Sequence, residues 1–216
     1  MTIELVSALP AARAPEEPEA VPAWAAAEII EAGQRMDALG WVRATAGNLS
    51  LRVAGDRIAI TRSGCHKGFL TPDDVMLVDL AGHPVTAGRA SAETLLHCQI
   101  YALFADVGAV LHGHSLPATV LTMAQPGSLV LRGYEVLKAF GFATHEAEAT
   151  LPVFDNAQDI AALAERIAPT LEAGAPLGYA LRGHGVYAWG PDMPTARARL
   201  EALEFLLACE LERRKR

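Results

Sequence analysis

Two histidines separated by one glycine, His112 and His114, close an apolar run that begins at Val107. Because side chains alternate between the two faces of a strand, both imidazoles point the same way and can reach one metal ion. A third histidine, His184, lies far downstream in a second glycine-rich, strand-like stretch. Three nitrogen ligands with an open fourth position are typical of catalytic zinc. The spacing predicts one zinc ion per chain; ordinary strand histidines, the alternative, would need other partners once buried.

Short turns that contain glycine, serine or asparagine could bind a phosphate group. Glycine lets backbone N–H groups approach an anion closely, and a helix N-terminus carries a partial positive charge. We expect Ser91 to cap the N-terminus of a predicted helix, and Lys67 could add a positive charge. Taken singly, each motif is also explained by an ordinary turn, a helix cap or a surface lysine. The predicted phosphate-binding residues are Asn48, Ser63, Gly64, Lys67 and Ser91.

The composition limits the class of protein that carries these motifs. The chain has 216 residues and a formal net charge of -7, without the basic face that nucleic-acid binding requires. No apolar stretch approaches the ~18–20 residues of a membrane helix, and no signal peptide is recognisable. Cys65, Cys98 and Cys209 are widely spaced without a C-x-x-C motif, which favours a reducing cytoplasm. We expect a cytoplasmic protein that binds neither nucleic acid nor membrane.

Hydrophobic periodicity predicts one α/β domain. Residues 1–21 are rich in proline and acidic residues and are expected to form a flexible segment before a catalytic domain over 22–216. The expected fold is a single three-layer domain with a central mixed, mainly antiparallel sheet and helices on both faces. Helices are predicted over 22–39, 91–104, 116–124, 134–140, 157–172 and 194–214, and strands over 48–53, 57–61, 75–80, 107–112, 178–181 and 185–189.

Five short motifs follow one another along the chain: Thr45-Ala46-Gly47-Asn48, Thr61-Arg62-Ser63-Gly64 with Lys67-Gly68, Ser91-Ala92-Glu93, His112-Gly113-His114 and Arg182-Gly183-His184-Gly185. In this order the chain resembles the class II (zinc) sugar-phosphate aldolase and epimerase superfamily, from about residue 24 to residue 210. The resemblance implies the class II aldolase-like fold, zinc as cofactor and a small sugar phosphate as substrate. It also implies a homo-oligomer, commonly a cyclic tetramer with sites near subunit contacts.

The resemblance suggests roles for two glutamates. The superfamily residue that matches Glu93 lies near the metal as a fourth ligand or an acid/base, although Glu93 could also simply complement the positive end of a helix. The stretches 135–138 and 184–190 most resemble a branch of the superfamily that dehydrates a sugar phosphate. In that branch the residue matching Glu135 is the catalytic acid/base. Without the resemblance, Glu135 would be interpreted as a solvated glutamate at a helix start.

Three functions remain open from the sequence. The first is dehydration of a sugar phosphate, and the second is aldol cleavage or epimerisation of a substrate of the fuculose or ribulose phosphate type. The third is a non-catalytic binding role, against which the three histidines and two glutamates count. His97 is expected to be a satisfied structural histidine, or else to form a hydrogen bond beside the metal site. No motif includes His66, His83 or His145, which we expect at the surface or in loops.

Overall fold

The computed structural model describes residues 19–124 and 127–215, so residues 1–18 of the predicted flexible segment lie outside the described residues. The first helix, α1 (Ala23–Ala38), begins where the folded domain was predicted to start. Within the described ranges, no helix combines the length and apolar character needed to cross a bilayer. The other helices are α2 (Thr94–Leu103), α3 (Leu116–Ala124), α4 (Ile160–Glu172) and α5 (Met193–Arg213), with short 3-10 helices η1 (Lys67–Phe69), η2 (Pro72–Asp74) and η3 (Glu135–Phe140).

A seven-stranded sheet forms the centre of the molecule, with the strand order β3-β2-β1-β4-β9-β8-β7. Neighbouring strands are antiparallel except β7 and β8, which are parallel, so the sheet is mixed and mainly antiparallel as predicted. The strands of this sheet are β1 (Asn48–Ala54), β2 (Arg57–Thr61), β3 (Val75–Asp79), β4 (Ala109–Gly113), β7 (Val153–Phe154), β8 (Tyr179–Leu181) and β9 (Gly185–Gly190).

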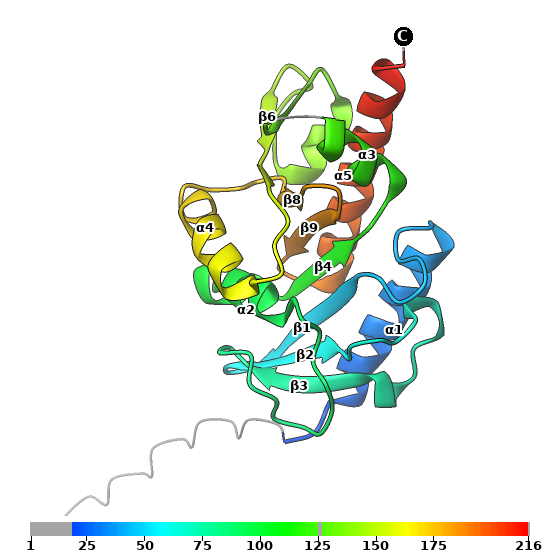
Figure 1. The fold of residues 1–216 in the computed structure, drawn as a ribbon, viewed down its shortest axis with the longest axis vertical. Helices are drawn as coiled ribbons and strands as arrows, with labels where there is room; N and C mark the ends of the chain where they lie inside the picture. The colour runs from blue at the N-terminus through cyan, green and yellow to red at the C-terminus, as the bar shows by residue number, and fades with distance from the viewer. Residues whose placement is uncertain (1–18, 125–126, 216) are drawn as a thin grey trace, which may run out of the picture.

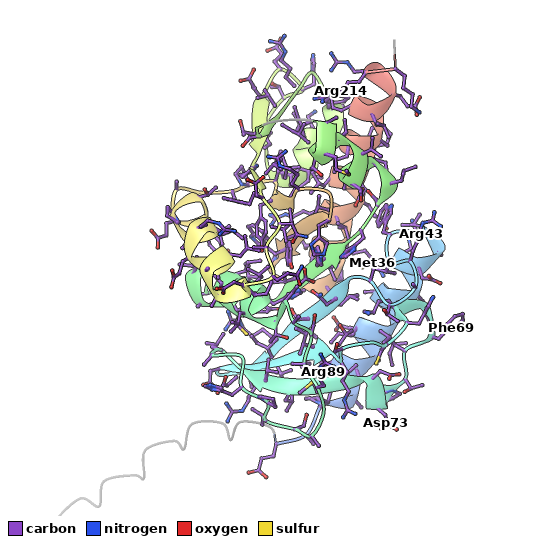
Figure 2. All side chains as sticks on the ribbon, in the orientation of Figure 1. Met36, Arg43, Phe69, Asp73, Arg89 and Arg214 are labelled. Atoms are coloured by element: carbon purple, nitrogen blue, oxygen red, sulfur yellow. The ribbon has the colours of Figure 1, made fainter. Side chains whose placement is uncertain are left out.

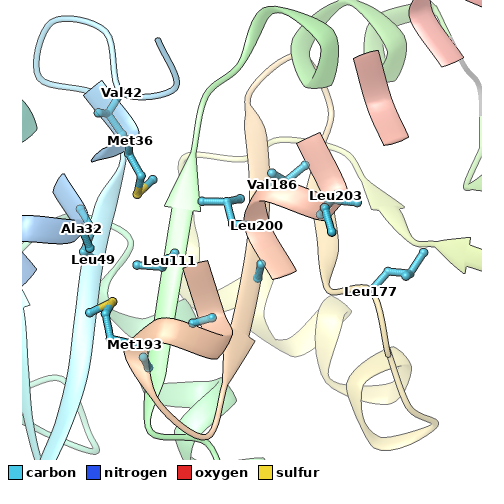
Figure 3. Packing of buried hydrophobic residues seen from close by; sticks show 14 of the residues in the cluster. Ala32, Met36, Val42, Leu49, Leu111, Leu177, Val186, Met193, Leu200 and Leu203 are labelled. Carbon is cyan, nitrogen blue, oxygen red and sulfur yellow. The ribbon is translucent and has the colours of Figure 1, made fainter. Parts of the chain in front are cut away.

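Helices cover both faces of the central sheet, α1 and α5 on one and α2 and α4 on the other (Figure 1). Successive strand residues alternate between these two cores, as Leu111 and Val110 of β4 do. Figure 3 shows Leu111 and Val186 in the core that Leu200 of α5 completes. The alternation places the side chain of His112 on the same face of the sheet as Val110, toward α2.

A second, two-stranded sheet was not predicted from the sequence. Its strands, β5 (Leu129–Arg132) and β6 (Glu148–Leu151), pair antiparallel, and η3 lies between them in the chain. Both strands alternate buried and exposed residues, but each spans only four residues, so their periodicity was too short to indicate a strand. The helix predicted over 134–140 is present as the 3-10 helix η3.

Helix α2 begins later than the sequence indicated. It starts at Thr94 with Glu93 at the N-cap position, so the prediction that Ser91 caps this helix is wrong. Ser91 instead forms a turn, in which its carbonyl oxygen accepts a hydrogen bond from the Thr94 backbone N–H at 3.1 Å. The Ser91 hydroxyl accepts a second one from Asn48 Nδ2 at 3.1 Å. This turn places Glu93 at the tip of the helix, facing the ends of β1 and β4.

Candidate functional site

Four ligating side chains converge where β4 ends and β9 begins: Glu93, His112, His114 and His184. Glu93 comes from the N-cap of α2, and His184 lies in the bend between β8 and β9. β4 and β9 are antiparallel neighbours, with Gly113 opposite Val186, so the end of one strand meets the start of the other. The sheet topology therefore brings together histidines that are about 70 residues apart in the chain.

The distances within this cluster suit a single metal ion. His112 Nε2 lies 2.8 Å from His114 Nε2 and 3.4 Å from His184 Nε2. Glu93 Oε1 lies 3.2 Å from His184 Nε2, and Glu93 Oε2 lies 3.5 Å from His112 Nε2. Ligand atoms in a tetrahedral zinc site are about 3.3 Å apart, given zinc–nitrogen bonds near ~2.0–2.1 Å.

The chemistry of these donors also fits a cation. Burial lowers the pKa of His112 well below its ordinary value and lowers the pKa of His114 to about 3. Both imidazoles are therefore neutral near pH 7, with a nitrogen lone pair available for a metal. Glu93 Oε1 is buried without a hydrogen-bond partner. A metal ion would supply this oxygen and the facing lone pairs with the positive charge that the protein does not.

Backbone and side-chain acceptors orient two of the imidazoles. His112 Nδ1 donates to the Val186 carbonyl oxygen at 2.9 Å, which leaves Nε2 unprotonated for the metal. The ring of His112 stacks on Tyr187, with centroids 4.0 Å apart. His184 Nδ1 lies 3.2 Å from Asn156 Oδ1. Sequence reasoning missed Asn156, because it belongs to no motif and lies 28 residues before His184 in the chain.

Glycines allow the close approach that the cluster requires. A Cβ atom at Gly185 would lie 2.2 Å from the Gly113 carbonyl oxygen and 2.9 Å from Cε1 of His112. Gly47 has a φ of +72°, and a Cβ there would lie 2.7 Å from the carbonyl oxygen of His112. Larger residues at these two positions would displace β4 and with it the imidazoles.

A cavity of about 360 Å³ opens beside the cluster, a size within the range of small-ligand sites. The residues that line it include Glu93, His114 and His184 on the cluster side. Arg62, which belongs to one of the sequence motifs but had no predicted role, also lines the cavity, as do Asn156 and Gln158, which no motif included. All five predicted phosphate-binding residues are part of the lining: Asn48, Ser63, Gly64, Lys67 and Ser91.

Three of these five residues, Asn48, Ser91 and Lys67, already form side-chain hydrogen bonds within the protein. Asn48 Nδ2 donates to Glu93 Oε2 at 2.7 Å and to the Ser91 hydroxyl at 3.1 Å. Lys67 is only 1% exposed, and its Nζ donates to the carbonyl oxygens of Thr45 and Cys65. Burial lowers the pKa of Lys67 from its ordinary value. Lys67 thus holds two cavity loops together and is not the surface lysine that was the alternative interpretation.

Glu135 lies apart from the cluster, on η3. Its side chain is 68% exposed and 2.5 Å from Lys138 Nζ, and its second oxygen is 3.8 Å from His145 Nδ1. The hydrogen bond from Lys138 lowers the pKa of Glu135. Glu135 is not among the residues that line the cavity at the cluster. Within one chain, the structure does not bring the predicted acid/base to the predicted metal ligands.

The remaining histidines occupy different surroundings. His83 is 78% exposed and lies 3.2 Å from Asp79, as expected for a surface residue. The ring of His66 contacts that of Phe69 at a tilt of 33°, and Phe69 is 77% exposed and projects away from the body of the molecule (Figure 2). His97 is fully buried between α2 and β1.

The family model of the class II aldolase and adducin N-terminal domain matches residues 27–211. The chain belongs to this family. Among class II aldolase relatives, the methylthioribulose-1-phosphate dehydratase of Granulibacter bethesdensis is 62% identical over 201 residues, which cover 90% of this chain and 94% of that one. The dehydratase of the same name from Acidiphilium cryptum is 58% identical over 208 residues, which cover 94% of this chain and 98% of that one.

Solved class II aldolase structures share the fold. The l-fuculose-1-phosphate aldolase of Thermus thermophilus superposes with a TM-score of 0.72 at 28% identity, covering 89% of this chain and 95% of that one. Another L-fuculose 1-phosphate aldolase superposes with a TM-score of 0.77 at 22% identity, covering 92% and 90% of the two chains. The predicted class II aldolase-like fold and the superfamily resemblance are thereby confirmed.

Proposed function

We propose that this chain is a zinc-dependent hydro-lyase that converts 5-methylthioribulose 1-phosphate to 2,3-diketo-5-methylthiopentyl 1-phosphate in cytoplasmic methionine salvage. The observation that carries the proposal is the 58–62% identity, over nearly the whole chain, to proteins named methylthioribulose-1-phosphate dehydratase. The geometry supports it because the cluster of three histidines and one glutamate opens onto a cavity of about 360 Å³. In this reaction C3 loses a proton and C4 loses its hydroxyl group as water.

The residues present fit one zinc ion per chain. His112, His114 and His184 would hold it, with Glu93 as the fourth ligand or as a base beside it. When bound, zinc supplies Lewis-acid stabilisation of negative charge on the substrate oxygens near the carbon that loses its proton. The buried Val186 carbonyl contact keeps His112 in the tautomer that can bind metal.

The far side of the cavity suits the phosphate group of the substrate. Ser63 and Gly64 form an exposed turn there, and Gly64 has a φ of +83°. Arg62 and Lys67 also line the cavity; Arg62 Nη2 donates to the Ala87 carbonyl oxygen at 2.8 Å, and the Lys67 ammonium group donates to two backbone carbonyl oxygens. Backbone N–H groups, the serine hydroxyl and these two cations would fix the phosphate, so that the reacting carbons lie at the cluster.

Glu135 would perform the proton transfer in a homotetramer, acting at the cluster of a neighbouring copy. Two observations support this assignment: Glu135 is exposed on η3, and it is absent from the cavity of its own chain. A carboxylate exposed in this way can complete the site of a second copy that packs with its cavity against η3. At that site Glu135, kept ionised by Lys138, would take the proton that C3 loses and return it to the C4 hydroxyl as water leaves.

A product assay with purified protein tests this function directly. We expect loss of 5-methylthioribulose 1-phosphate to be matched by formation of the diketone, with about one zinc per chain by elemental analysis. Release of a shorter sugar phosphate fragment would instead indicate a class II aldolase, the activity named in the fuculose phosphate aldolase structures. Absence of either reaction from zinc-loaded protein would favour a non-catalytic relative.

A further inference from the structure

A line of buried polar side chains leads from the interior of the protein to Glu93. It consists of Tyr101, Ser50, His97 and Asn48, each of which is at most 3% exposed. Asn48 and Ser50 are two residues apart on β1, so they share one face of the sheet. His97 and Tyr101 are four residues apart on α2, so they share one face of the helix. The polar pair on the strand, Asn48 and Ser50, thus faces the polar pair on the helix, His97 and Tyr101.

Each member of this line contacts the next at hydrogen-bonding distance. The Tyr101 hydroxyl lies 2.9 Å from Ser50 Oγ, which lies 2.7 Å from His97 Nδ1. His97 Nε2 contacts Asn48 Oδ1. Asn48 Nδ2 then donates to Glu93 Oε2 at 2.7 Å. At the far end, Arg52 donates to the Tyr101 carbonyl oxygen at 2.7 Å and covers its ring.

The chemistry of the groups fixes the direction of every hydrogen bond. A carboxylate that binds a metal is deprotonated and only accepts, so the Asn48 amide must turn its NH₂ group toward Glu93. The Asn48 carbonyl oxygen therefore faces His97 and must receive a proton from Nε2. His97 is then unprotonated at Nδ1, which accepts from the Ser50 hydroxyl, and Ser50 accepts in turn from Tyr101. If donor and acceptor were exchanged in any one of these hydrogen bonds, a buried polar group would be left without a partner.

We infer that His97 is a positioning residue for the metal site: its Nε2–H group sets the orientation of the Asn48 amide, which holds the Glu93 carboxylate against the three histidines. This inference rests on the proposed zinc site and extends it to a residue for which the sequence favoured a structural role. It also gives Asn48 a role besides the predicted phosphate binding, because both of its polar atoms are used here.

The surroundings of His97 keep it in the required form. Burial lowers its pKa to about 4, so it is neutral near pH 7 and carries one ring proton. That proton cannot sit at both nitrogens, and the Ser50–Tyr101 pair selects Nε2 by donating to Nδ1. Partners of this kind beside a metal ligand typically change metal affinity by about 10–100-fold.

Metal titration of two complementary variants tests the inference. Chelator-stripped protein is titrated with Co²⁺ as a coloured probe, and its visible spectrum reports the coordination geometry. His97→Gln keeps a donor at the Nε2 position, whereas His97→Asn reaches only the Nδ1 position. We expect the Asn variant to lose about 10-fold or more in Co²⁺ affinity and to show an altered spectrum, with the Gln variant within about 3-fold of wild type.

Two further variants separate positioning from folding. Leu96→Ala removes a fully buried neighbour of His97 on α2 whose side chain has no polar atom and takes no part in the hydrogen-bonded line, so it should lower stability but leave Co²⁺ affinity unchanged. Ser50→Ala keeps His97 but frees its tautomer, and should weaken Co²⁺ binding by several-fold, about 3- to 10-fold. This variant carries the test if the His97 variants do not fold.

The outcomes distinguish this inference from the proposed function. Equal Co²⁺ affinity and spectra for wild type, His97→Asn and Ser50→Ala would overturn the positioning role while the metal site stood. If His97→Asn, His97→Gln and Leu96→Ala all lost Co²⁺ affinity to the same extent, His97 would contribute only packing, and the positioning role would be overturned. A wild-type protein that binds neither Co²⁺ nor Zn²⁺ would overturn the proposed metal site itself.

Discussion

The histidine cluster and the segment around Glu135 are built in opposite ways. The cluster sits on the central strands β4 and β9, with the His112 side chain fully buried and that of Glu93 12% exposed. Glu135 sits on a 3-10 helix between two four-residue strands, and its side chain is 68% exposed. The cluster is held by neighbours from several elements, whereas Lys138 and His145, which pair with Glu135, are its near neighbours in the chain.

This difference separates two requirements of the proposed reaction. Metal ligands must be placed accurately before the metal arrives, and a packed sheet provides that accuracy. A proton-transfer group must titrate and reach the substrate, which an exposed carboxylate can do once a second surface covers it. Under the proposed function, one chain would hold a complete metal site and would contribute only Glu135 to the acid/base step, and the following predictions test that division.

The largest effect is expected from removing a ligand. In His112→Ala, loss of one nitrogen from the cluster should abolish stoichiometric zinc binding and reduce turnover by about 10³-fold or more, since zinc stabilises charge in the reaction. Elemental analysis and the diketone assay measure the two effects. Full zinc content together with full activity would show that the cluster is not the metal site.

A smaller loss, with a different signature, is expected at Glu135. Glu135→Gln preserves shape but cannot exchange a proton, so turnover should fall by about 10²-fold or more while zinc content stays at the wild-type level. Because Glu135 is exposed, the thermal unfolding midpoint should not move. Activity near that of wild type would contradict the role of Glu135 and would leave Glu93, the carboxylate in the cluster, as the candidate acid/base.

Mixing the two inactive variants tests whether Glu135 acts on another copy. A site composed of intact histidines from one chain and Glu135 from its neighbour can re-form only in mixed oligomers. When equal amounts of the two variants exchange subunits at random, half of the sites have intact histidines and half have an intact Glu135 from the neighbouring chain. About one quarter of the sites therefore have both, and about one quarter of the wild-type activity should return. Recovery requires unfolding and refolding the variants together. No recovery from confirmed mixed oligomers would mean that Glu135 does not act across subunits.

Ser63→Ala should produce a milder and purely binding effect. Loss of one hydroxyl donor to the phosphate should raise KM by about 10-fold with little change in kcat, because the contact is remote from the reacting carbons. Steady-state kinetics measure the split. Ser128→Ala, which removes an exposed serine hydroxyl outside the cavity, serves as the matched control. Unchanged kinetics in Ser63→Ala would remove this residue from the phosphate site.

The smallest expected effect concerns stability and contrasts a buried carboxylate with the exposed one of Glu135. Glu204 accepts a hydrogen bond from Ser115, next to His114, and burial raises its pKa to about 7. Between its ordinary pKa of 4.5 and pH 7, the folded state keeps a proton that the unfolded state releases, so stability falls as pH rises.

The variant Glu204→Gln should remove this contribution. The difference in unfolding free energy between variant and wild type should then grow by at most about 1.4 kcal/mol per pH unit across that window. Urea unfolding of both proteins at several pH values gives the difference directly, and it cancels the opposite contribution of the buried histidines. A difference independent of pH would mean that Glu204 titrates alike in both states.

The sequence predicted the central sheet and its helices because long periodic segments bury one face. It also singled out the three histidines: the spacing of His112 and His114 at the end of a strand makes both point the same way, and His184 lies in a second glycine-rich stretch. It did not predict β5 and β6, or the two-residue edge strand β7 of the central sheet, which are too short to show a period. The turn at Ser91 was mistaken for a helix start, because a serine before a glutamate resembles an N-cap.

Other features depend on contacts between distant segments, which the sequence does not reveal. Asn156 meets His184 only because the loop before α4 passes the bend between β8 and β9. The line from Tyr101 to Glu93 forms only because β1 and α2 are aligned with each other. The residue pattern within either segment does not reveal that alignment. The position of Glu135 relative to the metal site was not predictable for the same reason.

Because Lys67 is buried, labels that react with lysine amines can reach only some of the lysines of this protein. The chain contains three lysines, Lys67, Lys138 and Lys215. Lys67 is 1% exposed and engaged with two carbonyl oxygens, whereas the side chains of Lys138 and Lys215 are 52% and 60% exposed. Besides the terminal amine, a dye or crosslinker will therefore attach at the C-terminal end or one helical turn from Glu135. Lys138 thus offers a native anchor for distance measurements between subunits, without an engineered cysteine.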